Sequence, residues 1–496
     1  MRMTGGQALV QSLKSEGIDT IFGLPGVQLD YAIDAFWEER DAIRMVHPRH
    51  EQATAYMADG YARSTGKIGS FIVVPGPGLL NATAGLSTAY ACSSPVLCIS
   101  GQIVSNQIGK GLGFLHEINN QLEMVSSVVK SAERAMTAQE IPTMVRRAFQ
   151  ALRTGRPRPV EIEIPPDVLE SVADIKILEP ENSIRAEESP GDPDLLQQAA
   201  DVLGNAEYPV ICAGGGVLSS QAWEELRELS RILEAPVLMS ENGRGAISDR
   251  DYHGLAGPLA TRELLNNADA VLIVGSRFNL NPQMVSVLPS GKPVIQIDID
   301  ADQIGKTVEL QVGVEADAKA ALGQLIEFVP DSNRKRESRM SELTAIKDAG
   351  RDAVGEMELQ AAYALAIRDV LPDDGILVSE MTQIGYWAHI LGGYPVYEPR
   401  TLLTPGYQGT LGYGFPTALG AQIGNPDKKV VSINGDGGFF YNVQELSTQA
   451  QQQIPVVTVV FNDGGYGNVR RMQVLKYGGH KIGTDLQNPN MVKMAE

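Results

Sequence analysis

Short apolar runs alternate along this chain with longer stretches in which apolar residues recur at helical spacing. In the first third, the runs at Thr20–Gly23, Gly69–Val74 and Val96–Ser100 predict strands, and Glu51–Thr65 predicts a helix. Strands separated by helices and by Gly/Pro turns are typical of a parallel sheet with helices on both faces.

The same alternation returns twice more. Further strands are predicted at Pro209–Cys212, Ala270–Gly275, Val294–Asp300, Gly375–Ser379, Lys429–Asn434 and Val456–Phe461. The periodicity fades over about 174–193, where Pro, Glu and Ser accumulate at 181–192, and again over 331–351, which is charged and carries no strand signal. Both segments are predicted to be linkers. We therefore expect an α/β protein with three doubly wound parallel-sheet domains, at residues 1–172, 190–330 and 356–496.

The end of the chain interrupts the pattern of the third domain. Residues 490–496 look like a helix that has just begun, with no glycine stop after it. Because a natural domain seldom stops at such a point, we expect this domain to be truncated.

Composition narrows the class of protein. Hydrophobic residues make up 43% of the 496 positions and charged residues 20%, which is ordinary for a globular chain and unlike a disordered one. The 41 basic and 60 acidic side chains give a net charge of −19, which repels phosphate backbones, so no nucleic-acid partner is expected.

No signal peptide is visible, and no apolar run reaches the roughly 20 residues that cross a membrane. With three cysteines, an odd number, the chain is predicted to hold reduced thiols and to be cytoplasmic.

Two polar, glycine-rich turns carry the strongest chemical signal. NGDGG at 434–438 follows a predicted strand, and its glycines let a backbone approach a phosphate, while a helix predicted at about 442–451 offers N–H groups to an anion. Asp436 supplies an oxygen ligand of the kind that Mg²⁺ prefers. NDGGYG at 462–467 follows the next strand, and ligands of open α/β sheets bind at the carboxyl ends of strands. The pair predicts a metal–diphosphate site.

A second set of turns flanks Glu51. This glutamate opens a predicted helix within RHEQA at 49–53, a position where an acidic residue usually acts as an electrostatic cap. GLPG at 23–26 and PGPGLLN at 75–81 lie on either side of it in chain order and predict tight turns at the ends of two more strands.

Taken together, these motifs resemble those of thiamine-diphosphate-dependent enzymes of the acetolactate synthase, pyruvate oxidase and benzaldehyde lyase group, and most of all acetolactate synthase large subunits. The matching motifs are GLPG at 23–26, RHEQAT at 49–54, PGPGLLN at 75–81, QIDIDADQIGKT at 296–307, GTLGYGFPTALG at 409–420, INGDGGF at 433–439 and NDGGYG at 462–467. Their order and spacing along the whole chain are far more specific than any single motif. The resemblance implies an N-terminal pyrimidine-binding domain, a central domain and a C-terminal diphosphate-binding domain.

The resemblance also implies roles for individual residues. Glu51 would hold the aminopyrimidine of the cofactor in the form that deprotonates the reactive carbon. Asp436, Asp463 and the backbone carbonyl of Gly465 would hold Mg²⁺ on the diphosphate, and Leu411 would be the apolar wedge that bends the cofactor. Further cofactor contacts are implied for Pro25, Asn81, Thr382, Gln383, Gly409, Gly435, Gly437, Gly438 and Tyr466.

The chain departs from the family pattern at three positions. The usual Asn-Asn turn is Asn462-Asp463, which keeps a metal ligand and adds negative charge. His116 stands where acetolactate synthases carry Gln, and is either an acid/base near the substrate or a histidine packed in a loop. Gln28 stands where benzaldehyde lyase has His. Both join Glu51 as candidate catalytic residues.

A flavin is possible but not favoured. Several relatives bind FAD in the central domain, and Gly214–Gly216 and GSRF at 275–278 resemble that region. However, NLNP at 279–282 replaces the continuation found in acetolactate synthases, and similar glycine-rich turns occur in flavin-free relatives.

The resemblance implies an enzyme that uses thiamine diphosphate and Mg²⁺ to cleave or form a C–C bond next to a carbonyl. The expected reaction is decarboxylation of a small 2-oxo acid such as pyruvate, with carboligation to an acetohydroxy acid. Two alternatives stay open: a lyase or decarboxylase of a bulkier 2-oxo acid or 2-hydroxy ketone (an acyloin), and a cofactor-binding paralogue without turnover. Because the family builds each site from two subunits, a homodimer or homotetramer is expected.

Overall fold

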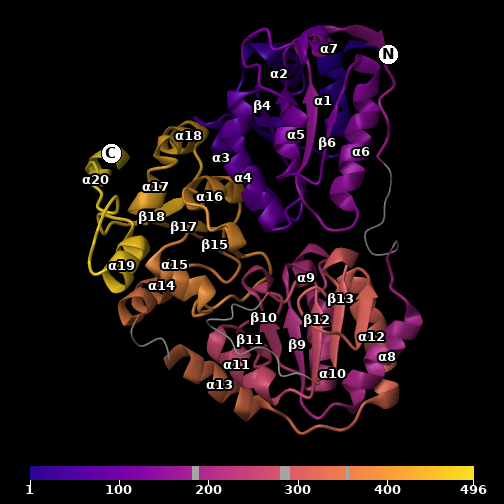
Figure 1. Cartoon of the computed structure of the whole chain (residues 1–496), viewed down its shortest axis with the longest axis vertical. Helices are drawn as coiled ribbons and strands as arrows, with labels where there is room; N and C mark the ends of the chain where they lie inside the picture. Colours follow the sequence, from indigo (N-terminus) through magenta and orange to yellow (C-terminus); the bar gives the residue numbers. More distant parts are fainter. Residues whose placement is uncertain (181–188, 280–290, 353–356) are drawn as a thin grey trace. The chain divides into compact units, whose positions relative to one another are not determined.

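The computed structural model describes residues 1–180, 189–279, 291–352 and 357–496 (Figure 1). The chain forms two compact units. One unit contains Met1–Ser183 together with Pro405–Glu496, and the other contains Ile184–Thr404. Three sequence predictions fall outside the described residues, in full or in part: the linker at about 174–193, the NLNP segment and the start of the third domain at 356.

The N-terminal part of the first unit is built on a six-stranded parallel sheet. In spatial order its strands are β3 (Arg44–Val46), β2 (Thr20–Gly23), β4 (Gly69–Val73), β5 (Val96–Gly101), β7 (Val160–Ile164) and β6 (Ser131–Arg134). Its helices are α1 (Gly5–Ser15), α2 (Asp30–Glu38), α3 (Glu51–Thr65), α4 (Pro77–Ala91), α5 (Gln121–Ser126), α6 (Ile141–Arg153) and α7 (Pro166–Glu170). β1 (Arg2–Thr4) and β8 (Val172–Asp174) form a separate antiparallel pair. The predicted strands and the predicted helix of this region are confirmed.

Helices cover both faces of this sheet (Figure 1). Apolar residues of α1, α2 and α6 share one core with Ile72, Leu97 and Ile162 of the strands. α3 and α4 pack against each other and contact β4. Because successive residues of a strand point to opposite faces, a strand buried on both sides is mostly apolar. The fully buried β4 has one polar side chain, Ser70, whose hydroxyl donates a hydrogen bond to the carbonyl oxygen of Thr20 (2.9 Å).

The C-terminal part of the first unit contributes β17 (Val430–Gly435) and β18 (Val457–Phe461), which pair in parallel. Its helical segments are η8 (Gly406–Gln408), α16 (Gly414–Gly424), α17 (Asp436–Phe439), η9 (Val443–Glu445), α18 (Leu446–Gln452), α19 (Gly467–Lys476) and α20 (Met491–Ala495). The helix predicted at about 442–451 is confirmed, with a first turn that is a 3-10 helix (η9) and continues into α18. Before it, Nδ2 of Asn442 donates a hydrogen bond to the carbonyl oxygen of Gly412 (2.7 Å).

The backbones of α3 and α16 approach each other closely. A Cβ on Gly420 would lie 2.0 Å from the carbonyl oxygen of Met57, and one on Gly60 would lie 2.1 Å from that of Thr417. Any side chain at either glycine would therefore force the two helices apart.

The second unit holds another six-stranded parallel sheet. In spatial order its strands are β11 (Gly254–Leu255), β10 (Val237–Met239), β9 (Pro209–Ala213), β12 (Ala270–Val274), β13 (Val294–Asp298) and β14 (Val312–Glu315). Its α-helices are α8 (Pro193–Asn205), α9 (Gly215–Ser219), α10 (Trp223–Leu233), α11 (Pro258–Asn267), α12 (Ala318–Ser332), α13 (Met340–Asp352), α14 (Glu358–Val370) and α15 (Gln383–Gly385), which continues into the π-helical segment η7 (Tyr386–Ile390). β15 (Ile376–Ser379) and β16 (Leu402–Leu403) form a parallel pair. The α/β class prediction is confirmed.

The predicted linker at 331–351 is largely wrong. Helix α13 occupies most of it, and Leu343 is fully buried in a cluster with Leu264 of α11. Arg336 is held by hydrogen bonds from its guanidinium to the backbone carbonyls of Leu203 and Ala206 (2.8 and 2.7 Å). One buried leucine in a charged helix leaves too weak a periodic signal to detect in the sequence.

Replacing Gly420 by alanine is expected to lower the free energy of unfolding by about 1–3 kcal/mol, because the new methyl group collides with the backbone of α3. The midpoint of thermal unfolding, followed by circular dichroism, measures the change.

Gly323→Ala is the matched control, because a Cβ at this helical glycine of α12 meets nothing within 4 Å. It is expected to stabilise the chain by about 0.5–1 kcal/mol through helix propensity. A Gly420→Ala midpoint equal to that of the control would contradict the close contact between α3 and α16.

Candidate active site

Glu51 is the first residue of α3, directly after the turn that follows β3. The preceding His50 caps the helix, since its Nδ1 accepts a hydrogen bond from the backbone N–H of Gln52 (3.1 Å). The Glu51 side chain is half-buried, and its Oε2 accepts a hydrogen bond from Nδ2 of Asn81 on α4 (3.0 Å). The fold therefore brings together two residues that the sequence presents in separate motifs.

Gln28 and His116 are also joined through the loop that carries His116. Gln28 is buried, and its Nε2 donates a hydrogen bond to the carbonyl oxygen of Leu115 (3.2 Å). His116 lies in the left-handed region (φ 68°), and a Cβ on Gly76 would be 2.3 Å from its carbonyl oxygen. Neither Oε1 of Gln28 nor Nδ1 of His116, both buried, has a hydrogen-bond partner among the described residues. Each thus offers an unused polar atom.

Glu117 anchors the same loop, and sequence reasoning missed it. Its carboxylate accepts hydrogen bonds from the backbone N–H groups of Gly111, Gly113 and Phe114, at 3.1, 2.6 and 2.9 Å. The hydrogen bond from Phe114 is the main reason that the pKa of Glu117 lies below its ordinary value, because N–H donors stabilise the charged carboxylate. The run of alternate glycines before an acidic residue is the signal that could have identified it.

Asp436 and Asp463 lie near each other at the carboxyl ends of the paired strands β17 and β18. Asp436 is buried, whereas the side chain of Asp463 is 57% exposed. Partial burial and the negative charge of Asp436 raise the pKa of Asp463. Nδ2 of Asn488 donates hydrogen bonds to Oδ2 of Asp436 (2.6 Å) and to Oδ1 of Asn462 (2.9 Å). A cation between the two carboxylates would relieve their repulsion.

These oxygens fit Mg²⁺ bound together with a diphosphate. No group of three or more His, Cys, Asp or Glu side chains suited to a metal occurs among the described residues. Mg²⁺ does not need such a cage, because it commonly binds one or two carboxylates and completes its shell with phosphate and water. Gly465, whose carbonyl is the third predicted ligand, is buried and forms an isolated β-bridge with Asp485.

The glycines of NGDGG border the same place. Gly435 precedes α17 and has no side chain to cap it, and Gly437 and Gly438 are buried within this helical turn. A Cβ on Gly437 would be 2.7 Å from the ring of Tyr466. The ring thus lies directly against the turn, and burial raises the pKa of its phenol.

Leu411 is half-exposed in a loop that is fixed on both sides of it. The hydroxyl groups of Thr410 and Thr88 are hydrogen-bonded at 2.8 Å, and Asn442 binds the carbonyl of Gly412. A rigid loop with an accessible apolar side chain is the geometry that a wedge against a ligand requires.

The remaining predicted residues lie at three places. Pro25 is exposed in the turn after β2, and Gly409 adopts a left-handed conformation (φ 56°) after η8. Thr382 and Gln383 belong to the second unit, where Oγ1 of Thr382 accepts a hydrogen bond from the N–H of Gly385 (2.9 Å) and caps α15.

Glu445 ties the start of α3 to the C-terminal part of the unit. Its buried carboxylate accepts hydrogen bonds from the backbone N–H groups of Arg49 (3.0 Å) and His50 (3.1 Å), and from the hydroxyl of Thr448 (2.6 Å). Burial raises its pKa. Sequence reasoning missed this residue, since an acid seven positions after a glycine motif carries no signal of its own.

Family comparison assigns the class of protein. The chain matches the thiamine pyrophosphate enzyme N-terminal binding domain over residues 3–124, the central domain over 196–325 and the C-terminal binding domain over 380–496. It belongs to the thiamine pyrophosphate enzyme family, and is thus a thiamine-diphosphate-dependent enzyme of the transferase and lyase type.

Individual relatives are similar along almost all of the chain. A probable acetolactate synthase large subunit of Methanococcus aeolicus is 33% identical over 100% of this chain and 86% of its own length. The acetolactate synthase large subunit of Haemophilus influenzae is 32% identical over 100% and 88%. The probable 2-ketoarginine decarboxylase AruI of Pseudomonas aeruginosa is 33% identical over 94% and 83%.

Glu445→Ala is expected to lower the free energy of unfolding by about 1–3 kcal/mol, because two backbone N–H groups beside Glu51 lose their acceptor. Glu445→Gln keeps an acceptor oxygen and should cost clearly less. Chemical denaturation of the three proteins measures both effects.

Glu38→Ala, an exposed position on α2, is the control and should change stability by less than about 0.5 kcal/mol. Equal losses for Glu445→Ala and Glu38→Ala would show that the buried carboxylate does not hold the start of α3.

Proposed function

We propose that this enzyme uses thiamine diphosphate and Mg²⁺ to decarboxylate a small 2-oxo acid, pyruvate in the first instance, and to join the resulting fragment to a second carbonyl compound. The observation that carries this proposal is the half-buried Glu51, oriented by Asn81 at a helix N-terminus within the matched N-terminal domain. Relatives named as acetolactate synthases, similar over the whole chain, support the same reaction.

In this proposal, the cofactor and the residues of this chain have distinct roles. When bound, thiamine diphosphate supplies the carbon nucleophile and the electron sink for the substrate carbonyl. Glu51 would exchange a proton with the aminopyrimidine, and Asn81 would keep the carboxylate in place. Asp436, Asp463 and the carbonyl of Gly465 would hold Mg²⁺.

The other predicted contacts complete the site. Leu411 would shape the cofactor, and a group of turns would line it: Pro25, Thr382, Gln383, Gly409, Gly435, Gly437, Gly438 and Tyr466. Residues 1–172 would serve as the pyrimidine-binding domain, 190–330 as the central domain and 356–496 as the diphosphate-binding domain. FAD is not part of this proposal.

A bulkier 2-oxo acid or an acyloin is the second candidate substrate. The relative named as a 2-ketoarginine decarboxylase favours it, as do Oε1 of Gln28 and Nδ1 of His116, which have no hydrogen-bond partner in the described part of the chain. Such atoms can bind polar groups that pyruvate lacks. A buried polar atom without a hydrogen bond costs free energy, and a ligand that supplies the missing partner removes that cost.

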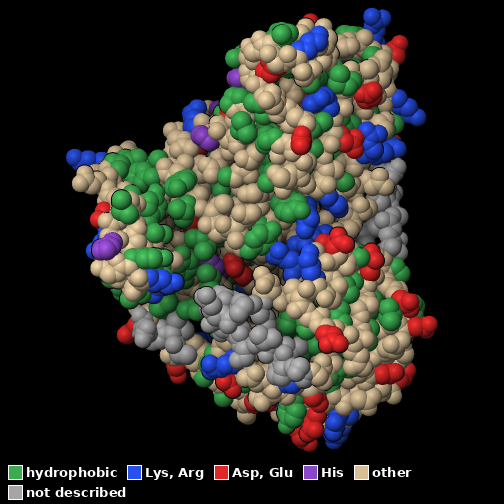
Figure 2. Space-filling model, in the orientation of Figure 1, with side chains coloured by type: hydrophobic (Ala, Val, Ile, Leu, Met, Phe, Trp, Pro, Cys, Tyr) green, Lys and Arg blue, Asp and Glu red, His purple; other side chains and the backbone are tan. Residues whose placement is uncertain are grey.

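A homo-oligomer is proposed from exposed apolar side chains on the C-terminal segment. Val469, Val474 and Leu475 of α19, together with the nearby Tyr441 and Tyr477, are exposed, and Figure 2 shows apolar side chains gathered over this segment. A second copy of the chain would cover them.

A cytoplasmic location is proposed as well. Within the described residues, no helix combines the length and apolarity needed to cross a membrane.

Glu51→Gln is expected to keep cofactor binding, measured by quenching of intrinsic fluorescence, and to reduce turnover at least about 100-fold, because the amide cannot exchange the proton. Proton NMR of pyruvate consumption, with and without added FAD, measures turnover. Glu38→Gln serves as the control with unchanged activity. Full activity in Glu51→Gln would refute the assignment.

Asp463→Asn restores the Asn-Asn turn of the family and is expected to keep activity within about threefold, because an amide oxygen still binds Mg²⁺. Asp463→Ala should raise the Mg²⁺ concentration needed for half-maximal activity about tenfold or more. An Mg²⁺ dependence of Asp463→Ala equal to that of the parent would exclude Asp463 as a ligand.

A further inference from the structure

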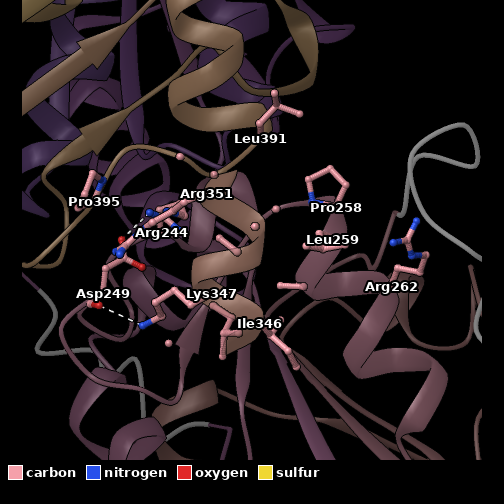
Figure 3. A pocket seen from close by; sticks show the side chains of 18 residues that line it. Arg244, Asp249, Pro258, Leu259, Arg262, Ile346, Lys347, Arg351, Leu391 and Pro395 are labelled. Atoms are coloured by element: carbon pink, nitrogen blue, oxygen red, sulfur yellow. Dashed lines mark hydrogen bonds and ion pairs between the residues drawn. The ribbon is translucent and has the colours of Figure 1, made fainter. Parts of the chain in front are cut away.

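A cavity of about 320 Å³ lies within the second unit, between α11, α13 and the segment at 391–395 (Figure 3). None of its lining residues belongs to the glycine turns at 214–216 and 275–278 that resemble a flavin region. Its size suits a small organic molecule.

The charged side chains of this cavity are mainly cationic. Arg244, Arg262, Lys347 and Arg351 line it, against the single carboxylate of Asp249. That carboxylate is already engaged by Nη2 of Arg244 (2.5 Å) and by the backbone N–H of Val396. Such a concentration of positive charge is unusual in a chain whose net charge is −19.

Three of the cations keep capacity to bind an anion. Arg262 and Arg351 have loose ion-pair partners on their own helices, Glu263 at 3.4 Å and Asp348 at 3.6 Å. Both acids are well exposed and outside the lining. Nζ of Lys347 donates to two backbone carbonyls, which uses two of its three N–H groups.

Two further donors have no partner of their own. Nε of Arg244, whose side chain is 2% exposed, has no hydrogen-bond partner among the described residues. The N-terminus of α11 also lines the cavity through Pro258, Leu259 and Ala260, and its cap, Gly257, has no side chain to satisfy the first N–H groups. A helix N-terminus carries partial positive charge and favours an anion. In Figure 3, Arg244, Arg351 and Lys347 lie on one side, and Pro258 and Arg262 lie on the other.

The remaining wall is apolar and includes Leu255, Ile346 and Leu391. We propose that this cavity is a binding site for a small organic anion, with its carboxylate or phosphate group between Arg244, Lys347 and Arg351 and its short apolar body against the leucines. The site lies outside every residue assigned above to thiamine diphosphate or Mg²⁺.

The cavity is connected to candidate cofactor residues by one helical segment. Leu391 and Gly392 follow directly on η7, and this helix starts beside Thr382 and Gln383. A Cβ on Gly257 would lie 2.4 Å from the carbonyl oxygen of Leu391, so the wall cannot shift without moving the segment. An occupant therefore stabilises one end of a segment whose other end is assigned to the cofactor. This consequence rests on the proposed function, whereas the site itself does not.

The test uses the full chain saturated with thiamine diphosphate and Mg²⁺, so that the diphosphate site is not open to the probes. Binding of isobutyrate is followed by saturation-transfer NMR, and binding of inorganic phosphate by ³¹P line broadening. Arg262→Gln/Arg351→Gln removes two half-exposed cations and should weaken binding about tenfold or more. Arg227→Gln, on α10 and paired with Glu224, is the control and should bind like the parent.

Binding of isobutyrate alone, or of phosphate alone, supports the site and identifies the anionic group. Binding of neither probe overturns the proposed site, as does equal binding by the parent and the double variant at equal thermal stability.

The coupling is tested separately. Isobutyrate should change the affinity for thiamine diphosphate in the parent and not in the double variant. Anion binding without that change overturns only the coupling, and no arm of the test depends on turnover.

Discussion

The contact between α3 and α16 is the constraint on which the first unit depends. These helices come from opposite ends of the chain, and glycines at 60 and 420 let their backbones touch. Because α3 begins with Glu51, its packing on α16 determines where that carboxylate can lie. The carboxylate of Glu445 then holds the backbone just before Glu51, so both the body and the start of the helix are attached to the C-terminal part.

A buried polar cluster fixes the other end of the same helix. Nη1 of Arg63 donates a hydrogen bond to the hydroxyl of Tyr413 (2.8 Å) and lies 3.5 Å from Oδ2 of Asp59. Burial raises the pKa of both Asp59 and Tyr413, although the positive charge of Arg63 opposes this. Charges so deeply buried are tolerated only when they are paired. Since Tyr413 closely follows Leu411, the cluster also stabilises the loop of the predicted wedge.

The two units distribute charge differently around their candidate sites. In the first, Asp436 and Asp463 present negative charge that a divalent cation would neutralise. In the second, an acidic chain gathers arginines and a lysine around one cavity. Asp436 and Asp463 are like charges that lie close together, whereas Arg244, Arg262 and Arg351 each have an acidic partner. Because each site still carries an excess of one sign of charge, we propose a cation for the first and an anion for the second.

The sequence by itself determined the elements and the motif residues. Apolar runs bounded by Gly and Pro mark β2, β4 and β5, since strands buried on both faces tolerate little else. It also predicted that Asp436 and Asp463 would be neighbours, because parallel strands bring their carboxyl ends to one edge. Tertiary structure alone decided the roles of Glu445 and Asn488, and the helix α13. A side chain that binds groups far away along the chain, or a single buried leucine in a charged helix, leaves no periodic pattern, so only the folded chain reveals them.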